Sequence, residues 1–391
     1  MFRDVYMVSA ARTAVGSFGR SLRDKSTIDL AAHAVRQAIE RAGIDPGSVE
    51  EVVMGCVGQH GLNAFLGRIA ALQAGCSQES SGQTVNRLCA SGLQAIVTAA
   101  TAIDHGDMSV VVAGGAESMS NYPYSSHGAR WGLRMGNAEL TDALITALSE
   151  PFSGTHIAIT AENIAEKYGL SRERLDAYAL ESQERAAKAI EAGCFEDEIA
   201  PIEIKSKRET VIFDTDEHPR QTSLEKLGKL PALFKKDGVV TAGNASGIND
   251  AGAAVVLMNT GAVQKNHCKP IAKIVDYAVS GVDPNYMGMG PVPATRKLMQ
   301  KCGLDQADIG LYELNEAFAA QAIACIDELG LDPERVNVNG SGISLGHPIG
   351  ATGAIIAIKL IQEMRRRHIR YGIASLCIGG GQGLSVLFEN I

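Results

Sequence analysis

The chain carries a similar run of elements near each of its ends, and this repeat limits the possible folds more than any other feature. In the first third, Ser91-Gly92 opens an apolar helical stretch, and a strand then leads into Gly114-Gly115. In the last third, Thr352-Gly353, a helical stretch and a strand lead into Gly379-Gly380 in the same order. The residues match weakly one by one, but their order and spacing indicate an internal duplication. We therefore expect two related α/β halves that face each other.

Hydrophobic periodicity predicts alternating strands and helices on both sides of a central segment. Strands are expected over residues 5–10, 49–56, 109–113, 271–280, 309–314 and 372–378. Helices are expected over residues 28–42, 67–74, 91–103, 161–168, 172–192, 294–303, 316–329 and 350–364. Residues 249–258 show an apolar pattern that suits a strand or a helix.

A long segment of different character interrupts the first half. Residues 117–249 are richer in charge, proline and aromatic side chains, and they hold the only tryptophan, Trp131. Ser171 is expected to cap the helix that follows it, and Gly193 to close that helix. A long insertion in an α/β unit is usually functional, so we expect a lid or a binding surface here.

Composition excludes several classes of protein. The formal net charge of −8 argues against a nucleic-acid surface, which needs a basic face. The basic run 365–368 is expected to be the solvated C-terminus of a helix. The 8 cysteines are scattered without a CxxC pair, so no metal site is expected. Without a membrane-length apolar stretch or a secretory leader, the chain is expected to be a cytoplasmic protein with free thiols.

Cys89 stands at the start of the helical stretch 91–103, in the sequence NRLCASG. A helix N-terminus has free N–H groups and a partial positive charge, which lower the pKa of a thiol. Cys89 is therefore either buried filler, which is the commoner case, or a nucleophile. His347, in SLGHPIGATGA, is either a structural hydrogen-bonding residue or the imidazole partner that such a nucleophile needs.

Three further features have both a structural and a chemical interpretation. Cys377 ends an apolar strand in SLCIGGGQG, where it is either a core residue or part of a site, with the Gly379 N–H as an oxyanion donor. Asn315 and Glu316 either cap the helix that follows or place an amide where it holds a water against an oxyanion. The loop 240–250 is either a simple turn or a surface that faces a nucleotide or pantetheine.

Taken together, these features resemble the thiolase family over essentially the whole chain. The resemblance rests on nine ordered motifs: NRLCASG (86–92), GGAESM (114–119), HIAITAEN (156–163), DTDEHPR (214–220), VTAGNASGIND (240–250), MGMGPVPA (287–294), NEAFAAQ (315–321), NGSGISLGHPIGATGA (339–354) and CIGGGQG (377–383).

The resemblance implies a thiolase fold of the α/β class. Two similar βαβαβαββ halves would form a layered α-β-α-β-α arrangement with an inserted loop domain. The first half would comprise residues 1–118 and 250–268, the loop domain residues 119–249, and the second half residues 269–391. The resemblance also implies a homodimer or homotetramer.

The resemblance also implies roles for individual residues. Cys89 would become S-acylated, His347 would take its proton, and Cys377 would move the α-proton of acetyl-CoA. Asn315, through a water, and His347 Nε2 would form one oxyanion hole, and the N–H groups of Cys89 and Gly379 the other. The coenzyme A and acyl tunnel would be lined by Leu148, His156, Arg220, Ser246, Met287, Ala317 and Phe318.

The implied activity is reversible Claisen condensation of acetyl-CoA with acyl-CoA, or thiolysis of 3-ketoacyl-CoA, with ping-pong kinetics. Coenzyme A and acetyl-CoA would be substrates, with no tightly bound cofactor. His156 favours acetoacetyl-CoA or another short-chain substrate. Ala90, Ile157-Ala158 and the GSG at 340–342 depart from the usual family pattern and bear on acyl length and branching.

Three alternatives remain open from the sequence. One is a degradative thiolase for medium or long acyl chains. The second is a decarboxylating ketoacyl synthase, which does not need Cys377. The third is a non-catalytic acyl-CoA carrier, which would be expected to have lost Cys89 or His347, although both are present here.

Overall fold

The computed structural model describes residues 1–205 and 210–391. Its strands are β1 (Tyr6–Arg12), β2 (Gly16–Ser17), β3 (Glu51–Gly55), β4 (Ser81–Val85), β5 (Val110–Ser118), β6 (Tyr124–Ser125), β7 (Thr141–Asp142), β8 (Ile202–Lys205), β9 (Thr210–Phe213), β10 (Asn249–Met258), β11 (Ala272–Gly281), β12 (Leu311–Leu314), β13 (Tyr371–Ile378) and β14 (Gln382–Asn390). Its α-helices are α1 (Thr27–Ala42), α2 (Leu66–Gln73), α3 (Ser91–His105), α4 (Ala143–Ala147), α5 (Ala158–Tyr168), α6 (Arg172–Glu191), α7 (Leu224–Gly228), α8 (Thr260–Lys265), α9 (Pro291–Cys302), α10 (Ala319–Leu329), α11 (Gly342–Leu345) and α12 (Thr352–Arg367).

The main sheet consists of two similar parts, which confirms the expected duplication. The first part has the order β4-β3-β5-β10-β1, and the second has the order β12-β13-β14-β11. In each part a parallel pair, β3–β5 or β12–β13, is extended by two antiparallel strands, β10–β1 or β14–β11. The two parts meet where β1 pairs with β11 over two residues, Tyr6↔Lys273 and Met7↔Ala272.

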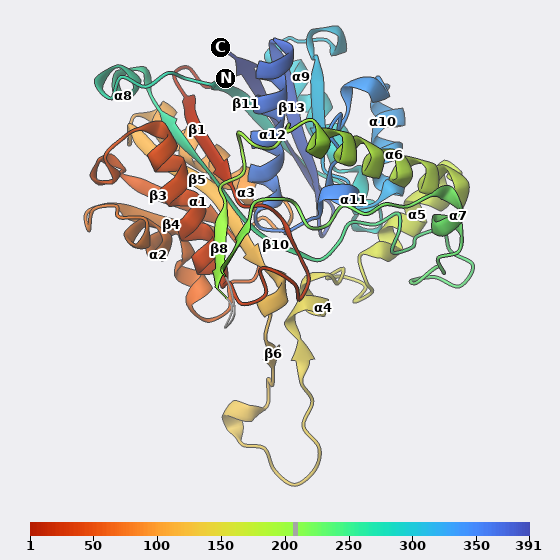
Figure 1. Cartoon of the computed structure of the whole chain (residues 1–391). Helices are drawn as coiled ribbons and strands as arrows, with labels where there is room; N and C mark the ends of the chain where they lie inside the picture. Colours follow the sequence, from red (N-terminus) through yellow and green to blue (C-terminus); the bar gives the residue numbers. More distant parts are fainter. Residues whose placement is uncertain (206–209) are drawn as a thin grey trace.

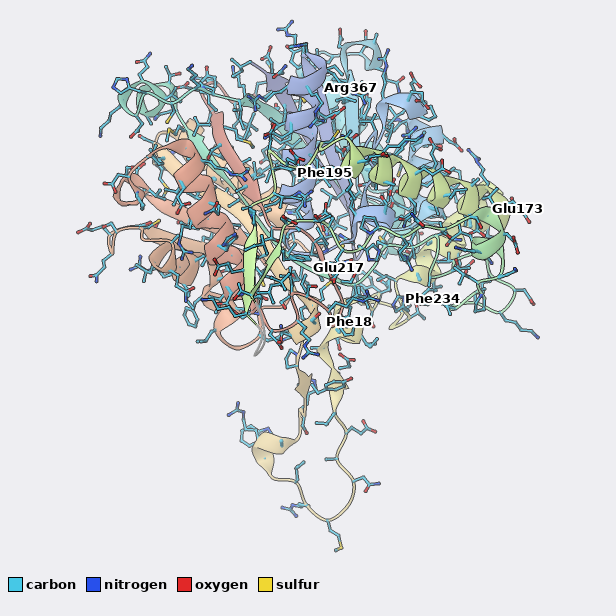
Figure 2. The ribbon with its side chains drawn as sticks, in the orientation of Figure 1. Phe18, Glu173, Phe195, Glu217, Phe234 and Arg367 are labelled. Atoms are coloured by element: carbon cyan, nitrogen blue, oxygen red, sulfur yellow. The ribbon has the colours of Figure 1, made fainter. Side chains whose placement is uncertain are left out.

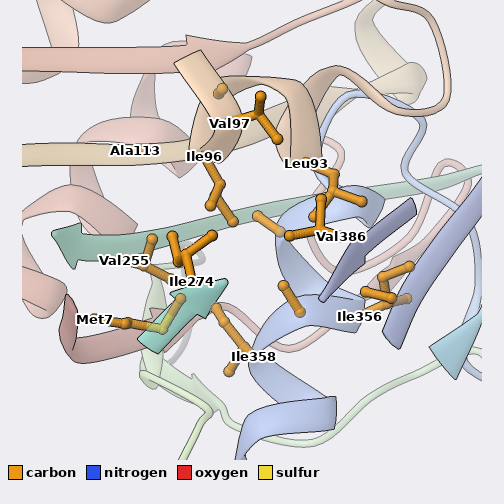
Figure 3. Packing of buried hydrophobic residues seen from close by; sticks show 14 of the residues in the cluster. Met7, Leu93, Ile96, Val97, Ala113, Val255, Ile274, Ile356, Ile358 and Val386 are labelled. Atoms are coloured by element: carbon orange, nitrogen blue, oxygen red, sulfur yellow. The ribbon is translucent and has the colours of Figure 1, made fainter. Parts of the chain in front are cut away.

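Helix layers lie between the two parts of the sheet and on the outer side of each part (Figure 1). Along β10, Val255 and Leu257 face the central layer with α3 and α12, whereas Val256 and Met258 face α1 and α2. This alternation follows from the period of two residues in a strand. A third apolar cluster packs α9 and α10 against β12 and β13. The central layer is dense with branched side chains (Figure 3). The resulting α-β-α-β-α layers confirm the predicted fold class.

The repeated small-residue pairs bring the N-terminal ends of α3 and α12 into contact. A Cβ added to Gly92 would lie 2.8 Å from Ala354 N, and one added to Gly353 would lie 2.3 Å from Leu93 N. Only glycine allows the two helices to approach this closely. The contact places Cys89, before α3, near His347, before α12.

Several helix ends agree with their sequence signals. Ser26 forms a capping box at the start of α1, and Gly43 ends that helix in the left-handed conformation. The Ser171 side chain caps α6 as expected. The basic run lies in the last turn of α12, which ends at His368 with φ +56°.

Two sequence expectations about the fold were wrong, and one strand was missed. Gly114 and Gly115 lie inside β5 rather than after it; a Cβ on Gly115 would lie 2.1 Å from the carbonyl oxygen of Gly350, so this glycine permits close approach of a neighbouring chain segment. Helix α10 begins at Ala319 instead of residue 316. The final strand, β14, was not predicted because it is buried on both faces and follows directly after three glycines.

The inserted segment contains a long hairpin whose base is the β6–β7 pair. This hairpin projects away from the body of the molecule (Figure 1). Among the described residues, no helix combines the length and the apolar character that crossing a membrane requires.

Candidate active site

A cavity of about 680 Å³ opens beside the N-terminal ends of α3 and α12. Cys89, His347 and Gly379, which are far apart in the sequence, all line it. All seven residues expected to line a tunnel also line this cavity: Leu148, His156, Arg220, Ser246, Met287, Ala317 and Phe318. The structure therefore brings this set together on one surface.

A tight turn positions Cys89 in the lining of the cavity. The preceding residue, Leu88, has φ +45°, a left-handed conformation that is unusual for a leucine. The Asn86 side chain accepts a hydrogen bond from Leu88 N at 3.0 Å, and the Ser91 hydroxyl donates one to the Leu88 carbonyl at 2.6 Å. These bonds stabilise the turn and keep Cys89 just before helix α3.

The thiol of Cys89 is neutral at rest. Burial raises its pKa to about 11, and hydrogen bonding from the Gly379 N–H offsets only part of that increase. The buried Glu117 carboxyl raises the pKa further. The pKa of this thiol was expected to be lowered and is instead raised, because burial outweighs the hydrogen bonds from the backbone N–H groups.

His347 is held in one orientation from two sides. Its backbone N–H donates to Asn249 Oδ1 at 2.9 Å, and its Nδ1 lies 2.7 Å from Thr352 Oγ1. The Thr352 hydroxyl donates its hydrogen to the Pro348 carbonyl at 2.9 Å, so its oxygen must accept from Nδ1–H. This hydrogen-bond pattern leaves Nε2 unprotonated, and Asn315 Nδ2 lies 3.4 Å from it. Burial lowers the pKa of His347 to about 4, so the ring is neutral.

Cys377 is the last but one residue of β13 and pairs with Gly383 of β14. It is fully buried and is not among the cavity-lining residues. Burial raises the pKa of the Cys377 thiol well above its ordinary value, and negative charge on the nearby sulfur of Cys89 or Cys325 would raise it further. The two sulfur atoms of Cys89 and Cys377 are therefore near enough for their charges to interact.

Asn315 follows strand β12 and caps no helix, because α10 begins at Ala319. Its backbone N–H donates to the Ser375 carbonyl at 2.9 Å. Among the described residues its Oδ1 atom has no hydrogen-bond partner, although it is buried. Its Nδ2 atom, on the other side of the amide, faces His347.

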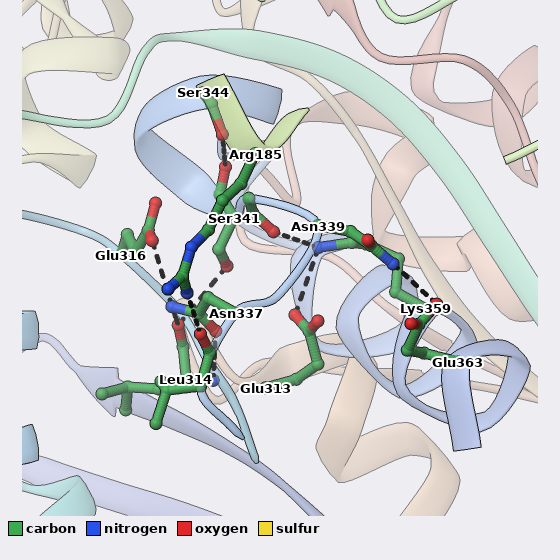
Figure 4. Close-up of polar contacts among 12 residues, drawn as sticks. Arg185, Glu313, Leu314, Glu316, Asn337, Asn339, Ser341, Ser344, Lys359 and Glu363 are labelled. Atoms are coloured by element: carbon green, nitrogen blue, oxygen red, sulfur yellow. Dashed lines mark hydrogen bonds and ion pairs between the residues drawn. The ribbon is translucent and has the colours of Figure 1, made fainter. Parts of the chain in front are cut away.

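A buried polar network fixes the backbone around Asn315 (Figure 4). The Asn337 side chain accepts from Leu314 N at 2.9 Å and donates to the Leu314 carbonyl at 2.8 Å. It also donates to Glu316 Oε1 at 3.1 Å. The other carboxylate oxygen of Glu316 accepts from Ser182 of α6 at 2.7 Å. The inserted segment and the second half are thus joined immediately beside Asn315.

Sequence reasoning missed three residues that orient the site. Thr352 was noted only as part of the repeat, yet its hydroxyl sets the tautomer of His347. Asn249, whose side chain accepts the hydrogen bond from His347 N, belongs to the loop 240–250, and the sequence of that loop was not specific for one function. Asn337 has φ +49°, and no local signal pointed to it.

Comparisons with known proteins agree over the full length of the chain. Residues 5–261 match the family described as "Thiolase, N-terminal domain", and residues 268–390 match "Thiolase, C-terminal domain". The chain is 50% identical over 394 residues to the beta-ketothiolase BktB of Cupriavidus necator, with 100% of both chains covered.

Solved structures are equally similar. The acetyl-CoA acetyltransferase of Bacillus anthracis superposes with a TM-score of 0.98 at 46% identity, covering 100% of this chain and 99% of that one. Human mitochondrial 3-ketoacyl-CoA thiolase in complex with CoA superposes with a TM-score of 0.96 at 44% identity, covering 100% of this chain and 98% of that one.

Proposed function

The chain belongs to the thiolase family, and from this premise we propose that it transfers acyl groups between coenzyme A thioesters through Cys89, with acetoacetyl-CoA or another short-chain 3-ketoacyl-CoA as substrate. One observation carries the assignment of residues. Cys89, His347 and Gly379 share a single cavity, and the Cys377 thiol lies close to Cys89.

In the first half-reaction, the Cys89 sulfur attacks the thioester carbonyl while its proton passes to His347 Nε2. The neutral ring is ready for this step because Thr352 holds the proton on Nδ1. The N–H groups of Cys89 and Gly379 stabilise the oxyanion, which collapses as the C–S bond to coenzyme A breaks. Cys377 gives its proton to the departing thiolate, and Cys89 is left acylated.

In the second half-reaction, a second acetyl-CoA loses an α-proton to the Cys377 thiolate. Asn315, through a water, and the Nε2–H of His347 stabilise the enolate oxygen. The enolate carbon then attacks the acyl carbonyl on Cys89, and the C–S bond breaks. His347 returns its proton to Cys89. Thiolysis runs through the same steps in reverse.

The surroundings of Cys89 suit an apolar acyl group. Met119, Leu144 and Ile349 form a buried cluster against which Cys89 and Leu148 pack. A short chain carried on the Cys89 sulfur would contact this cluster. We test the short-chain assignment by measuring thiolysis rates for 3-ketoacyl-CoA substrates of increasing length, including a 2-methyl-branched one. A maximum at medium or long chains would replace the short-chain assignment with the degradative alternative.

The decisive experiment for the function is incubation with acetyl-CoA followed by intact-mass measurement. We expect one acetyl adduct in the native protein and none in Cys89→Ala. A native protein that stays unmodified would favour the non-catalytic carrier and contradict the proposal.

We also propose a homodimer or homotetramer, with coenzyme A as substrate and the cytoplasm as location. The hairpin supports self-association because Trp131, Leu133 and Met135 on it are exposed. The free cysteines support a reducing compartment. We also propose domain boundaries at 1–118, 119–249, 250–268 and 269–391. The pairing of β10 with β5 supports an insertion between them, because the two strands are neighbours in the sheet although the segment 119–249 separates them in the sequence.

A further inference from the structure

The mouth of the cavity carries two side chains that the assigned site does not use. Phe18 and Arg20 both line the cavity, on the loop that follows β2. Phe18 is 51% exposed, so its ring is accessible to a ligand at the mouth. Within the described part of the chain, Arg20 has no carboxylate at salt-bridge distance. Figure 2 shows Phe18 together with Glu217 and Phe234, which also line the cavity.

Other residues of the same loop hold it in place. Ser17 N and the Ser21 hydroxyl donate to the two carboxylate oxygens of Glu217 at 2.9 and 2.7 Å. Gly19 N donates to the Ser120 hydroxyl at 2.8 Å. The loop is therefore anchored through its backbone and small side chains, which leaves Phe18 and Arg20 available to a ligand.

The charge at this mouth is favourable to an anion. Arg20, Arg220 and Glu217 are the lining residues with formal charges, and the oxygens of Glu217 already accept hydrogen bonds from the loop. The lining histidine His218 is neutral because burial lowers its pKa to about 4. Two guanidinium groups thus face the mouth in a protein whose net charge is −8.

We propose that Phe18 and Arg20 bind the nucleotide end of coenzyme A, an inference that rests on the proposed function. The Arg20 guanidinium donates hydrogen bonds to phosphate oxygens, a geometry that its planar group favours. The Phe18 ring stacks on the adenine face, as aromatic side chains do with nucleobases. These contacts lie far from the thioester, so they strengthen binding and leave the chemistry at Cys89 unchanged.

The test compares two acetyl donors that differ only in the nucleotide. We measure the second-order rate constant for acetylation of Cys89 by acetyl-CoA and by acetyl-pantetheine, which lacks the nucleotide and its phosphates. Arg20→Ala is expected to slow the reaction with acetyl-CoA about fivefold and to leave the reaction with acetyl-pantetheine unchanged. Phe18→Leu, which keeps apolar bulk without an aromatic face, is expected to show the same selectivity.

The chain offers a matched control in Arg23. This arginine belongs to the same loop, is exposed beside Asp24 at 3.5 Å, and does not line the cavity. Arg23→Ala should therefore match the native protein with both donors. Raising the salt concentration should slow native acetylation by acetyl-CoA more than that of Arg20→Ala.

Equal losses with both donors would mean that Arg20 only supports the loop, and they would overturn the proposal. An effect of Arg23→Ala as large as that of Arg20→Ala would also overturn it, since surface charge in general would then be the cause. Failure of this inference is distinct from failure of the function. A native protein without any acetyl adduct contradicts the function, whereas an active protein indifferent to Arg20→Ala contradicts only the nucleotide contact.

Discussion

Replacing Thr352 with valine isolates the hydrogen bond that sets the tautomer of His347. Valine keeps the shape of threonine but has no hydroxyl group. In the native protein Nδ1 lies 2.7 Å from Thr352 Oγ1, and both residues are buried. In Thr352→Val the Nδ1–H group would lose this acceptor, so the tautomer with the proton on Nε2 becomes more favourable.

The size of the effect follows from the cost of a buried donor without a partner. That cost is about 1–3 kcal/mol. Since about 1.4 kcal/mol corresponds to a tenfold change in rate, acetylation of Cys89 should slow by about 5- to 100-fold. Thr352 does not line the substrate cavity, so acetyl-CoA binding should stay unchanged.

The assay is a rapid-quench measurement of Cys89 acetylation over a range of acetyl-CoA concentrations. We expect a lower maximal rate at an unchanged half-saturating concentration. Thr352→Ser, which keeps the hydroxyl group, serves as the control and should acylate at close to the native rate. Thermal unfolding of both variants shows whether the fold is intact.

Native acetylation rates in a folded Thr352→Val protein would refute this reasoning. So would an equal loss in Thr352→Ser, because packing of the methyl group would then explain the effect. A weaker affinity for acetyl-CoA at a native maximal rate would likewise contradict a role through His347.

The remaining predictions concern proton transfer, pH and the network behind Asn315. Cys377→Ser should form acetoacetyl-CoA at least about a hundredfold more slowly, because an alcohol is a far weaker acid than a thiol; a native rate would favour a decarboxylating synthase. His347 has its pKa lowered to about 4 in the folded protein, whereas the unfolded chain takes up this proton near pH 6.5. Stability should therefore fall as the pH drops from about 6.5 to 4, by about 1.4 kcal/mol per unit for this residue. In urea unfolding His347→Asn should lose less stability over that range, and an identical loss would contradict the buried neutral ring. Asn337→Gly allows the positive φ but removes the side-chain hydrogen bonds to the Leu314 backbone. Chemical denaturation should therefore show a free energy of unfolding about 1–3 kcal/mol lower than in the native protein. An unchanged free energy of unfolding would contradict the role of the network.

Local sequence signals were sufficient for much of the fold. Helix α1 has its capping box at Ser26 and its stop at Gly43, and α6 has its cap at Ser171. Each of these signals acts between residues a few positions apart, so a single sequence contains it completely. The order of strands and helices in the two ends likewise predicted the duplication that the sheet confirms.

Local sequence signals misplaced the ends of elements where contacts with a distant segment determine the structure. The Gly114-Gly115 pair was expected to end a strand, because glycine is typical of turns. In the structure the pair accommodates the backbone of β10 and the carbonyl oxygen of Gly350, neither of which is near it in the sequence. The start of α10 was also misplaced, since Asn315 and Glu316 bond to β13, α6 and α11 instead of capping a helix.

The candidate site shows the same division between what local sequence signals determine and what distant contacts determine. The sequence by itself determined the residue types at each position, the two related halves and the helix that follows Cys89. Only the tertiary structure decided the ionisation and orientation of these groups. Burial leaves the Cys89 thiol and the His347 ring neutral, and the contact between Gly92 of α3 and the start of α12 places them in one cavity. Desolvation and proximity depend on what the rest of the chain packs around a group, and that information is absent from the residues next to it.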